Sequence, residues 1–388
     1  MTRSSPTAAP LPRVVIDLEK VRHINSGLGR FSLHLGQEIL QIADGRFQPV
    51  FFLPPGAERY FPPSGYVAKH AVRWQKEVTN RLVRMAVQRL LPKSDIDLWH
   101  ITNQHSKYLP LDERVPVILT IHDLNFLHEG EGECAAHTVT RKLAIVQKKL
   151  DRAAAITTIS AFVAADVQRH LDPRGKPIHV VHNGMPPPPP ASPSRPQFMP
   201  PGPFVLTIGN FLPHKNFHVL LDLIACLPEK RLVIAGKKAT HYGEFVEREV
   251  SRRGLHNRVV MPGELSDGDR QWLYEQCDAF LFPSLTEGFG FPVLEAMQCG
   301  KPVFMSRKTS LPEIAGDCGY FFESYGAAEM TAVFRDGMEH WAADPTLPSR
   351  CRRHAGSFSW RASAERYATI YESVLAATSR PPAAALPG

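Results

Sequence analysis

Two glutamates, Glu287 and Glu295, have seven residues between them and flank a glycine-rich bend in the segment TEGFGFPVLEAM. Two carboxylates at this spacing could act as an acid and base pair or hold the hydroxyls of a ligand. The preceding run DAFLFPS is typical of a buried strand, and Pro292 favours the first turn of a helix that stops at Gly300. We therefore expect Glu287 in a loop and Glu295 early in a helix whose N-H groups favour an anion. The alternative is a hinge loop with a glutamate that merely suits the helix dipole.

Other candidate residues also follow predicted strands. Lys215 lies in the loop GNFLPHKN, where a cation could stabilise charge that develops on a leaving phosphate, or could simply be a solvated loop lysine. His122 ends the buried run PVILTIHD, a position where a lone histidine often has only a structural role. Gly27 and Gly29 of NSGLGRF precede a helix, which is a weak signal for a phosphate loop and equally suits a tight turn.

Alternating strands and helices are expected to position these residues. Short β-rich runs such as RVVIDL, PVFFL, DLWHIT and AAAITTIS alternate with helical patterns as far as Gly184. This alternation predicts a parallel sheet covered on both faces. A segment with ten prolines in twenty residues follows, and the alternation restarts at FVLTIG. A chain of 388 residues, 43% of them hydrophobic, is large enough for two such cores.

The expected fold class is therefore α/β, with two doubly wound, Rossmann-like domains that face each other across a cleft. In such sheets ligands bind beyond the carboxyl ends of the strands, where the candidate residues are expected. The predicted segments are a disordered N-terminus (1–12), a first domain (13–185), a proline-rich linker (186–202), a second domain (203–358), a helix that crosses back to the first domain (359–378) and a disordered tail (379–388).

Composition limits the classes of partner. The 45 Lys and Arg residues against 38 Asp and Glu give a formal net charge of +7, which favours an anionic partner. Basic and aromatic residues are not interleaved as in single-strand-binding proteins, so we do not expect nucleic acid. The six cysteines lack the paired spacing of a zinc or redox site and fit a reducing compartment. No apolar run approaches the roughly 18 residues of a membrane span, and the first residues do not form a signal peptide, so we expect a cytoplasmic protein.

The run FLFPSLTEGFGFPVLEAMQCGKPVFMS closely resembles the signature of retaining glycosyltransferases of family 4. The resemblance extends over almost the whole chain and includes SGLGRFSLHL, LTIHDL, TTISAF, HNGM, GNFLPHKNFHVLL, RVVMPGELSD and SLPEIAGDCGYFF. In detail the sequence is most similar to mannosyltransferase-type members that build bacterial surface polysaccharides. The resemblance implies the GT-B fold, a nucleotide-sugar donor, and neither a bound metal nor another cofactor.

The resemblance also implies roles for particular residues. Glu287 would meet the hydroxyls of the donor sugar, His122 would lie near the reacting carbon, and Lys215 would neutralise the donor diphosphate. Glu295 would hold the ribose. The other donor-binding positions that it implies are Gly27, Gly29, Asn210, Leu265, Gly288, Phe289, Gly290 and Leu294.

One of these positions departs from the family pattern. Many members carry an arginine five residues before the lysine, whereas this chain has Asn210. The diphosphate site would then be incomplete or would use another cation, such as His214. Leu265, in PGELSD, is where the family reads the base through backbone groups.

Two further segments have alternative interpretations. Asp95 and Asp97 resemble a metal-binding Asp-x-Asp pair, but they lead into an apolar strand and offer too few ligands for magnesium, so we predict no metal site. Residues 69–93 predict a basic amphipathic helix. It could cover the first sheet with a solvated basic face, or bind anionic lipid at the inner face of the cytoplasmic membrane.

The expected function is transfer of a hexose with retention of configuration. The donor would be GDP-mannose, and the acceptor a saccharide or lipid-linked saccharide of lipopolysaccharide, O-antigen or exopolysaccharide synthesis. A sugar-nucleotide epimerase or a sugar phosphorylase on the same fold is one alternative. A non-catalytic protein that binds nucleic acid or polysaccharide is another.

Overall fold

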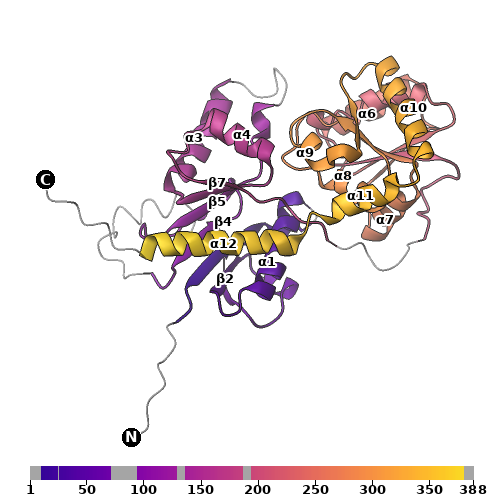
Figure 1. Ribbon diagram of the computed structural model, residues 1–388. Helices are drawn as coiled ribbons and strands as arrows, with labels where there is room; N and C mark the ends of the chain where they lie inside the picture. Colours follow the sequence, from indigo (N-terminus) through magenta and orange to yellow (C-terminus); the bar gives the residue numbers. More distant parts are fainter. Residues whose placement is uncertain (1–9, 25, 71–93, 129–135, 187–193, 380–388) are drawn as a thin grey trace, which may run out of the picture.

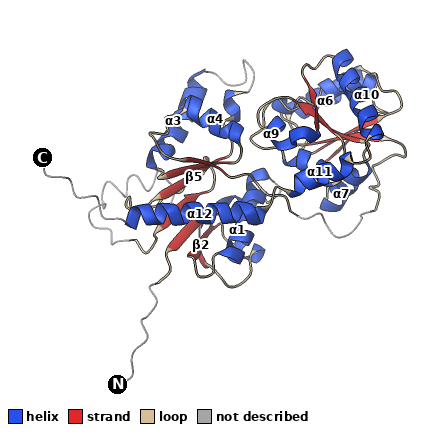
Figure 2. Ribbon diagram, in the orientation of Figure 1, coloured by secondary structure: helices blue, strands red, loops and turns tan. Residues whose placement is uncertain are grey.

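The computed structural model describes residues 10–24, 26–70, 94–128, 136–186 and 194–379, which form two α/β domains (Figure 1). In each domain helices lie on both sides of a parallel sheet (Figure 2). The predicted fold class is therefore confirmed. The predicted disorder at residues 1–9 and 380–388, and residues 187–193 of the predicted linker, lie outside the described residues.

The first sheet has the order β3-β2-β1-β4-β5-β6-β7, and all of its strand pairs are parallel. Its central strands are apolar because both of their faces are covered; in β5 all five residues are buried. The strands are β1 (Arg13–Asp17), β2 (Gln48–Leu53), β3 (Val67–His70), β4 (Leu98–Ile101), β5 (Val117–Ile121), β6 (Ala155–Thr158) and β7 (Ile178–Val180).

Two helices of the first domain begin at serine caps. Ser26 accepts a hydrogen bond from the N-H of Gly29, and Ser160 accepts one from Val163, which satisfies donors that a helix start leaves unpaired. The described helices are η1 (Glu19–His23), α1 (Gly27–Ile42), η2 (Ala57–Tyr60), η4 (Asn125–Leu127), α3 (Ala136–Arg152) and α4 (Ala161–His170).

The second sheet has the order β10-β9-β8-β11-β12-β13 and is also parallel. Its strands are β8 (Phe204–Ile208), β9 (Arg231–Ala235), β10 (Val259–Gly263), β11 (Ala279–Phe282), β12 (Val303–Ser306) and β13 (Gly319–Phe322). Its helices are η5 (Pro213–Lys215), α5 (Val219–Ala225), α6 (His241–Arg252), α7 (Asp267–Gln276), α8 (Phe291–Gln298), α9 (Leu311–Ala315), η6 (Gly316–Cys318), α10 (Ala327–Ala343) and α11 (Leu347–Gly356).

The last helix, α12 (Trp360–Ser379), returns from the second domain and lies along the first (yellow in Figure 1). Its Tyr371 hydroxyl lies 2.7 Å from Nδ1 of the buried His100, and Nε2 of that ring lies 2.7 Å from Thr120 Oγ1. At its surface, Arg46 forms 2.7 Å ion pairs with Glu365 and Glu372. Because buried polar groups are costly without partners, these contacts fix the helix in one position on the first domain.

The predicted basic helix at residues 69–93 is wrong at its start. Lys69 and His70 belong to β3, where they pair with Phe52 and Leu53 of β2. β3 is an edge strand whose residues are mostly exposed. Its sequence therefore lacks the alternating apolar pattern that would distinguish it from the start of a helix. Residues 71–93, and with them the membrane-binding interpretation, lie outside the described residues. Among the described helices, none has the length and apolar character needed to cross a bilayer.

Polar contacts join the two domains at the edges of their sheets. Glu313 of α9 accepts hydrogen bonds from the N-H groups of Ala161 (2.8 Å) and Phe162 (3.1 Å) at the start of α4. Its carboxylate also lies 2.6 Å from His182 Nε2. Glu313 belongs to the second domain, and its carboxylate thus lies at the positive N-terminal end of α4 in the first domain.

Candidate active site

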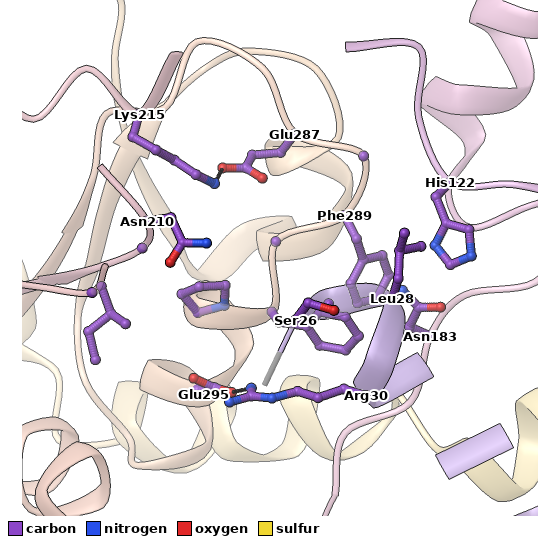
Figure 3. Close-up of a pocket in the computed structure, with 18 of the residues that line it drawn as sticks. Ser26, Leu28, Arg30, His122, Asn183, Asn210, Lys215, Glu287, Phe289 and Glu295 are labelled. Carbon is purple, nitrogen blue, oxygen red and sulfur yellow. Dashed lines mark hydrogen bonds and ion pairs between the residues drawn. The ribbon is translucent and has the colours of Figure 1, made fainter. Parts of the chain in front are cut away.

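A cavity of about 490 Å³ lies between the two domains (Figure 3). Loops that follow β5 of the first sheet and β8 to β11 of the second line it, together with the start of α1. In both sheets the strand order reverses beside the first strand, between β1 and β4 and between β8 and β11. The cavity thus lies where doubly wound sheets bind their ligands.

Most of the predicted site residues meet in this cavity. Those that line it are Gly27, His122, Asn210, Lys215, Leu265, Glu287, Gly288, Phe289, Gly290 and Glu295. Two predicted donor-binding residues, Gly29 and Leu294, do not line it. A Cβ at Gly29 would lie 2.0 Å from the carbonyl oxygen of His23, so this glycine permits a close turn before α1. Leu294 is fully buried in the apolar core behind α8.

The two predicted catalytic residues of the second domain are in direct contact. The ammonium of Lys215 forms an ion pair with Glu287 Oε1, and the two side chains are only 14% and 13% exposed. Lys215 also lies over the ring of Phe282, 5.2 Å from its centroid, and the N-H of Glu287 donates to Thr309 Oγ1 at 3.0 Å. The ammonium and the carboxylate thus neutralise each other. The sequence did not indicate this contact. An anionic ligand would have to share Lys215 with Glu287 or displace it.

Glu295 also has partners for both of its oxygens. Arg30 Nη1 of the first domain lies 2.5 Å from Oε1, and the hydroxyl of Tyr274 donates to Oε2 at 2.8 Å. Burial and then the carboxylate raise the pKa of Tyr274 well above its usual value, so the hydroxyl keeps its proton. Sequence reasoning placed Arg30 in the glycine motif but missed its contact with Glu295, and it missed Tyr274 entirely.

His122 is buried at the edge of the cavity, and its ring nitrogens have different surroundings. Nε2 lies 2.8 Å from the carbonyl oxygen of Thr102, which can only accept, so Nε2 carries the proton. The N-H of His122 donates to Gln104 Oε1 at 3.0 Å. Burial lowers the pKa of His122 to about 4. The ring is therefore neutral near pH 7 and cannot serve as an imidazolium acid.

The glycine bend brings the two domains into van der Waals contact. A Cβ at Gly288 would lie 2.2 Å from the carbonyl oxygen of His122, and Ser160 Oγ donates to the Gly288 carbonyl at 2.9 Å. Gly290 has a φ of 129°, a conformation that side chains disfavour. These glycines therefore set both the approach of the domains and the entry into α8, whose N-terminal residues line the cavity.

The cavity that Asn210 lines also contains several cations. Among the described residues that line the cavity, the basic ones are Arg30, Lys215, Lys237 and Arg270. His214, considered from the sequence as a replacement for the family arginine, is not among them. Arg270 already pairs with Asp267 at 2.9 Å, and Arg30 with Glu295 at 2.5 Å. The structure therefore offers Lys237 as a further cation, and Arg30 only through an exchange of partner with Glu295.

Asp95 and Asp97 lie away from the cavity. Asp97 accepts a 2.8 Å hydrogen bond from the N-H of Arg13, and Asp95 pairs with Arg13 and with Lys69. Arg13 begins β1, and both aspartates precede β4, so they lie at the amino edge of the sheet. This edge is opposite to the carboxyl edge that the cavity borders.

Comparisons with known proteins agree with this architecture. Residues 27–187 match the family model for Glycosyltransferase Family 4, and residues 193–356 match the model for Glycosyl transferases group 1. Among similar proteins, the Escherichia coli serotype-specific mannosyltransferase WbdA is 32% identical over 166 residues, which are 41% of this chain and 20% of that protein. The Escherichia coli O-antigen chain mannosyltransferase B is 32% identical over 162 residues, 40% of this chain and 42% of that protein. The matches thus span less than half of either relative.

Solved structures share the whole architecture. The sucrose-phosphate synthase of Thermosynechococcus elongatus has a TM-score of 0.68 at 18% identity, over 94% of this chain and 100% of that chain. Anabaena HepE in complex with UDP-glucose has a TM-score of 0.65 at 18% identity, over 93% of this chain and 99% of that chain. At this identity they show the fold alone. The chain thus consists of a Glycosyltransferase Family 4 domain followed by a Glycosyl transferases group 1 domain, arranged in the GT-B fold.

Proposed function

We propose that the protein transfers mannose from GDP-mannose, with retention of configuration, to a saccharide or lipid-linked acceptor in O-antigen or related polysaccharide synthesis. The observation that carries this proposal is the pair of acid and cation contacts, Lys215 with Glu287 and Arg30 with Glu295, in one cavity between the domains. Two relatives at 32% identity are mannosyltransferases by name, and one of them acts on O-antigen chains. HepE, which has the same fold, binds UDP-glucose.

The charges in the cavity suit a nucleotide diphosphate sugar. Lys215 would move from Glu287 to the diphosphate, and Glu287 would then be free to accept hydrogen bonds from hydroxyls of the sugar. Lys237 would supply the positive charge that Asn210 lacks, and Arg30 could add to it on leaving Glu295. Glu295, held by Tyr274, would accept hydrogen bonds from the ribose hydroxyls.

Retention requires that the bond to the leaving phosphate and the bond to the acceptor lie on the same face of the sugar. As the bond between C1 and the phosphate oxygen breaks, charge grows on the diphosphate, and Lys215 stabilises it directly. The acceptor oxygen forms its bond to C1 while its proton passes to the leaving phosphate oxygen. The neutral His122 can orient a hydroxyl near this centre, but it supplies no proton of its own.

We further propose that the reaction needs neither a metal nor another cofactor, because side-chain cations from both domains line the cavity and could neutralise a diphosphate. The protein would act in the cytoplasm, at the inner face of the membrane when its acceptor is lipid-linked.

The test is an assay with radiolabelled GDP-mannose and membranes that carry the unfinished saccharide. We expect label in the saccharide, undiminished by EDTA. An epimerase would convert the donor without acceptor, and a phosphorylase would require free phosphate, so product analysis separates these alternatives.

A further inference from the structure

A second, smaller cavity opens on the first domain beside the candidate active site. Its volume is about 250 Å³, and it is lined by η1 and by the loop that follows β4. Ligand pockets for drug-sized molecules measure roughly 300–1,000 Å³, so this recess suits a single group such as a phosphate better than a whole saccharide. Its lining residues, called here the basic recess, are Glu19, Lys20, Arg22, His23, His105, Lys107 and Tyr108.

The basic recess has an excess of positive charge. Glu19 lies 2.6 Å from Arg22 Nη2 and 3.4 Å from Lys20 Nζ, so one carboxylate with 13% exposure aligns two cations. Lys107 is exposed and, among the described residues, has no ion-pair partner. Three cations against one carboxylate leave a local charge that an anion would neutralise. Phosphate fits this arrangement because it accepts several charge-assisted hydrogen bonds at once.

Buried contacts hold the floor of the recess in place. The ammonium of Lys149, which is only 3% exposed, donates to the carbonyl oxygens of Gln104 (2.6 Å) and Ser106 (2.5 Å). The hydroxyl of Ser106 donates to the buried carboxylate of Asp17, which also accepts from the N-H of Glu19 at 3.1 Å. The charges of Lys149 and Asp17 offset each other, so the excess on the recess surface remains. These hydrogen bonds thus hold the loop and η1 against each other.

Two sets of hydrogen bonds connect the basic recess to the candidate active site. The carbonyl oxygen of His23 accepts from both the N-H and the hydroxyl of Ser26, each at 2.8 Å, and Ser26 lines the large cavity. Gln104, which precedes His105, accepts from the N-H of His122 at 3.0 Å and donates to the carbonyl oxygen of Asp123 at 2.9 Å. Each set of hydrogen bonds thus joins a residue that lines or adjoins the basic recess to residues that line the large cavity.

We infer that the basic recess binds a phosphate group of the acceptor. It would so hold the acceptor saccharide toward the large cavity between the domains, called here the donor cavity. This inference rests on the proposed function, because it assigns the first domain to the acceptor of that reaction. The phosphate could belong to a lipid-linked diphosphate saccharide or to a water-soluble phosphorylated saccharide. Both would present the same group to Lys20, Arg22 and Lys107.

The first experiment is calorimetric titration of the full chain with inorganic pyrophosphate. The double variant Lys20→Glu/Lys107→Glu should lose at least tenfold in affinity at one site, whereas Lys20→Arg/Lys107→Arg should retain it. Lys215→Ala/Lys237→Ala, in the donor cavity, should leave that site unchanged. Thermal unfolding of each variant checks that the fold survives. Pyrophosphate binding that Lys20→Glu/Lys107→Glu does not alter, or that Lys215→Ala/Lys237→Ala abolishes completely, would overturn the inference.

Further titrations separate the sources of the phosphate. Tighter binding of geranyl monophosphate than of glucose 6-phosphate, which carries the same phosphate group, indicates a lipid-linked acceptor, and the reverse order indicates a soluble one. In the mannose transfer assay, Lys20→Glu/Lys107→Glu should raise the KM for the acceptor tenfold or more and leave the KM for GDP-mannose unchanged. An unchanged acceptor KM would contradict the inference and leave the proposed function intact. Pyrophosphate binding at the recess without any sugar transfer would support the recess as a phosphate site and remove the proposed function.

Discussion

Arg30 of helix α1 forms an ion pair with Glu295 of helix α8, so the carboxylate expected to hold the ribose is joined to the opposite domain. The hydroxyl of Tyr274 donates a hydrogen bond to the second oxygen of Glu295. Protein groups thus contact both oxygens of the carboxylate predicted to hold the ribose, and a cation of the first domain lies within the donor cavity. On the proposed function, nucleotide binding would replace or share these contacts of Glu295.

Arg30→Ala should lower donor affinity about tenfold, because it removes a cation from the expected diphosphate position and leaves Glu295 as an uncompensated charge. Arg30→Lys should lose less, since it keeps the charge but not the planar guanidinium. Titration calorimetry with GDP-mannose measures the effect, with the surface variant Arg59→Ala as a control. Tighter binding by Arg30→Ala would show that Arg30 instead competes with the nucleotide.

Lys215→Ala and Glu287→Gln should each reduce kcat by roughly 10²–10³, the loss typical of removing a group that stabilises developing charge. Lys238→Ala is a matched control, because Lys238 pairs with Glu247 at 3.1 Å but both side chains are well exposed. Initial rates of mannose transfer check this, with circular dichroism to verify the fold. Rates within a few-fold of wild type in either site variant would remove these residues from the mechanism.

Gly288→Ala should push the domains apart. The new Cβ would lie 2.2 Å from the backbone oxygen of His122, which cannot move aside like a flexible side chain. We expect a loss of activity of at least tenfold and a larger radius of gyration by small-angle X-ray scattering. Gly356→Ala is the control, because a Cβ there meets nothing within 4 Å. If Gly288→Ala and wild type scatter alike and react alike, the contact between the domains is not needed for activity.

Stability should fall in mild acid because two histidines are buried in the neutral form. Burial lowers the pKa of His100 from 6.5 to about 3 and that of His122 to about 4. Below pH 6.5 the unfolded chain thus binds more protons than the folded one. The stabilisation that comes from keeping these histidines neutral is therefore complete above pH 6.5 and is lost as the pH falls toward their pKa values in the folded protein. Between pH 6.5 and about pH 5, protonation of each histidine in the unfolded chain lowers the free energy of unfolding by about 2 kcal/mol.

Asp17 acts in the opposite direction, because burial raises its pKa to about 6 and so favours the folded state at lower pH. One acid offsets only part of the effect of two histidines. Urea unfolding at pH 7 and pH 5 should show a net loss for wild type and a smaller loss for His100→Gln, which cannot take up the proton. An identical pH dependence in the variant would mean that His100 is not the group responsible.

The positions of the site residues in the fold followed from the sequence, but their contacts did not. Glu287 and His122 each follow an apolar strand, and parallel strands bring such residues to one edge. By contrast, Lys215 and Glu287 are 72 residues apart, and Arg30 and Glu295 are 265 apart, so no local spacing could indicate either ion pair. Leu294 does not line the cavity, and the family motif could not indicate this because it does not distinguish the cavity side of α8 from its core side.

The most direct test of the central claim is proton NMR of the mannose first released when the protein slowly hydrolyses GDP-α-mannose without acceptor. This measurement needs no knowledge of the acceptor, and it reports both donor choice and stereochemistry. We predict that the α anomer appears first, before mutarotation, and that Lys215→Ala releases almost none. Initial release of the β anomer, or the absence of turnover with GDP-mannose when a UDP-, ADP- or dTDP-sugar is consumed, would contradict this account.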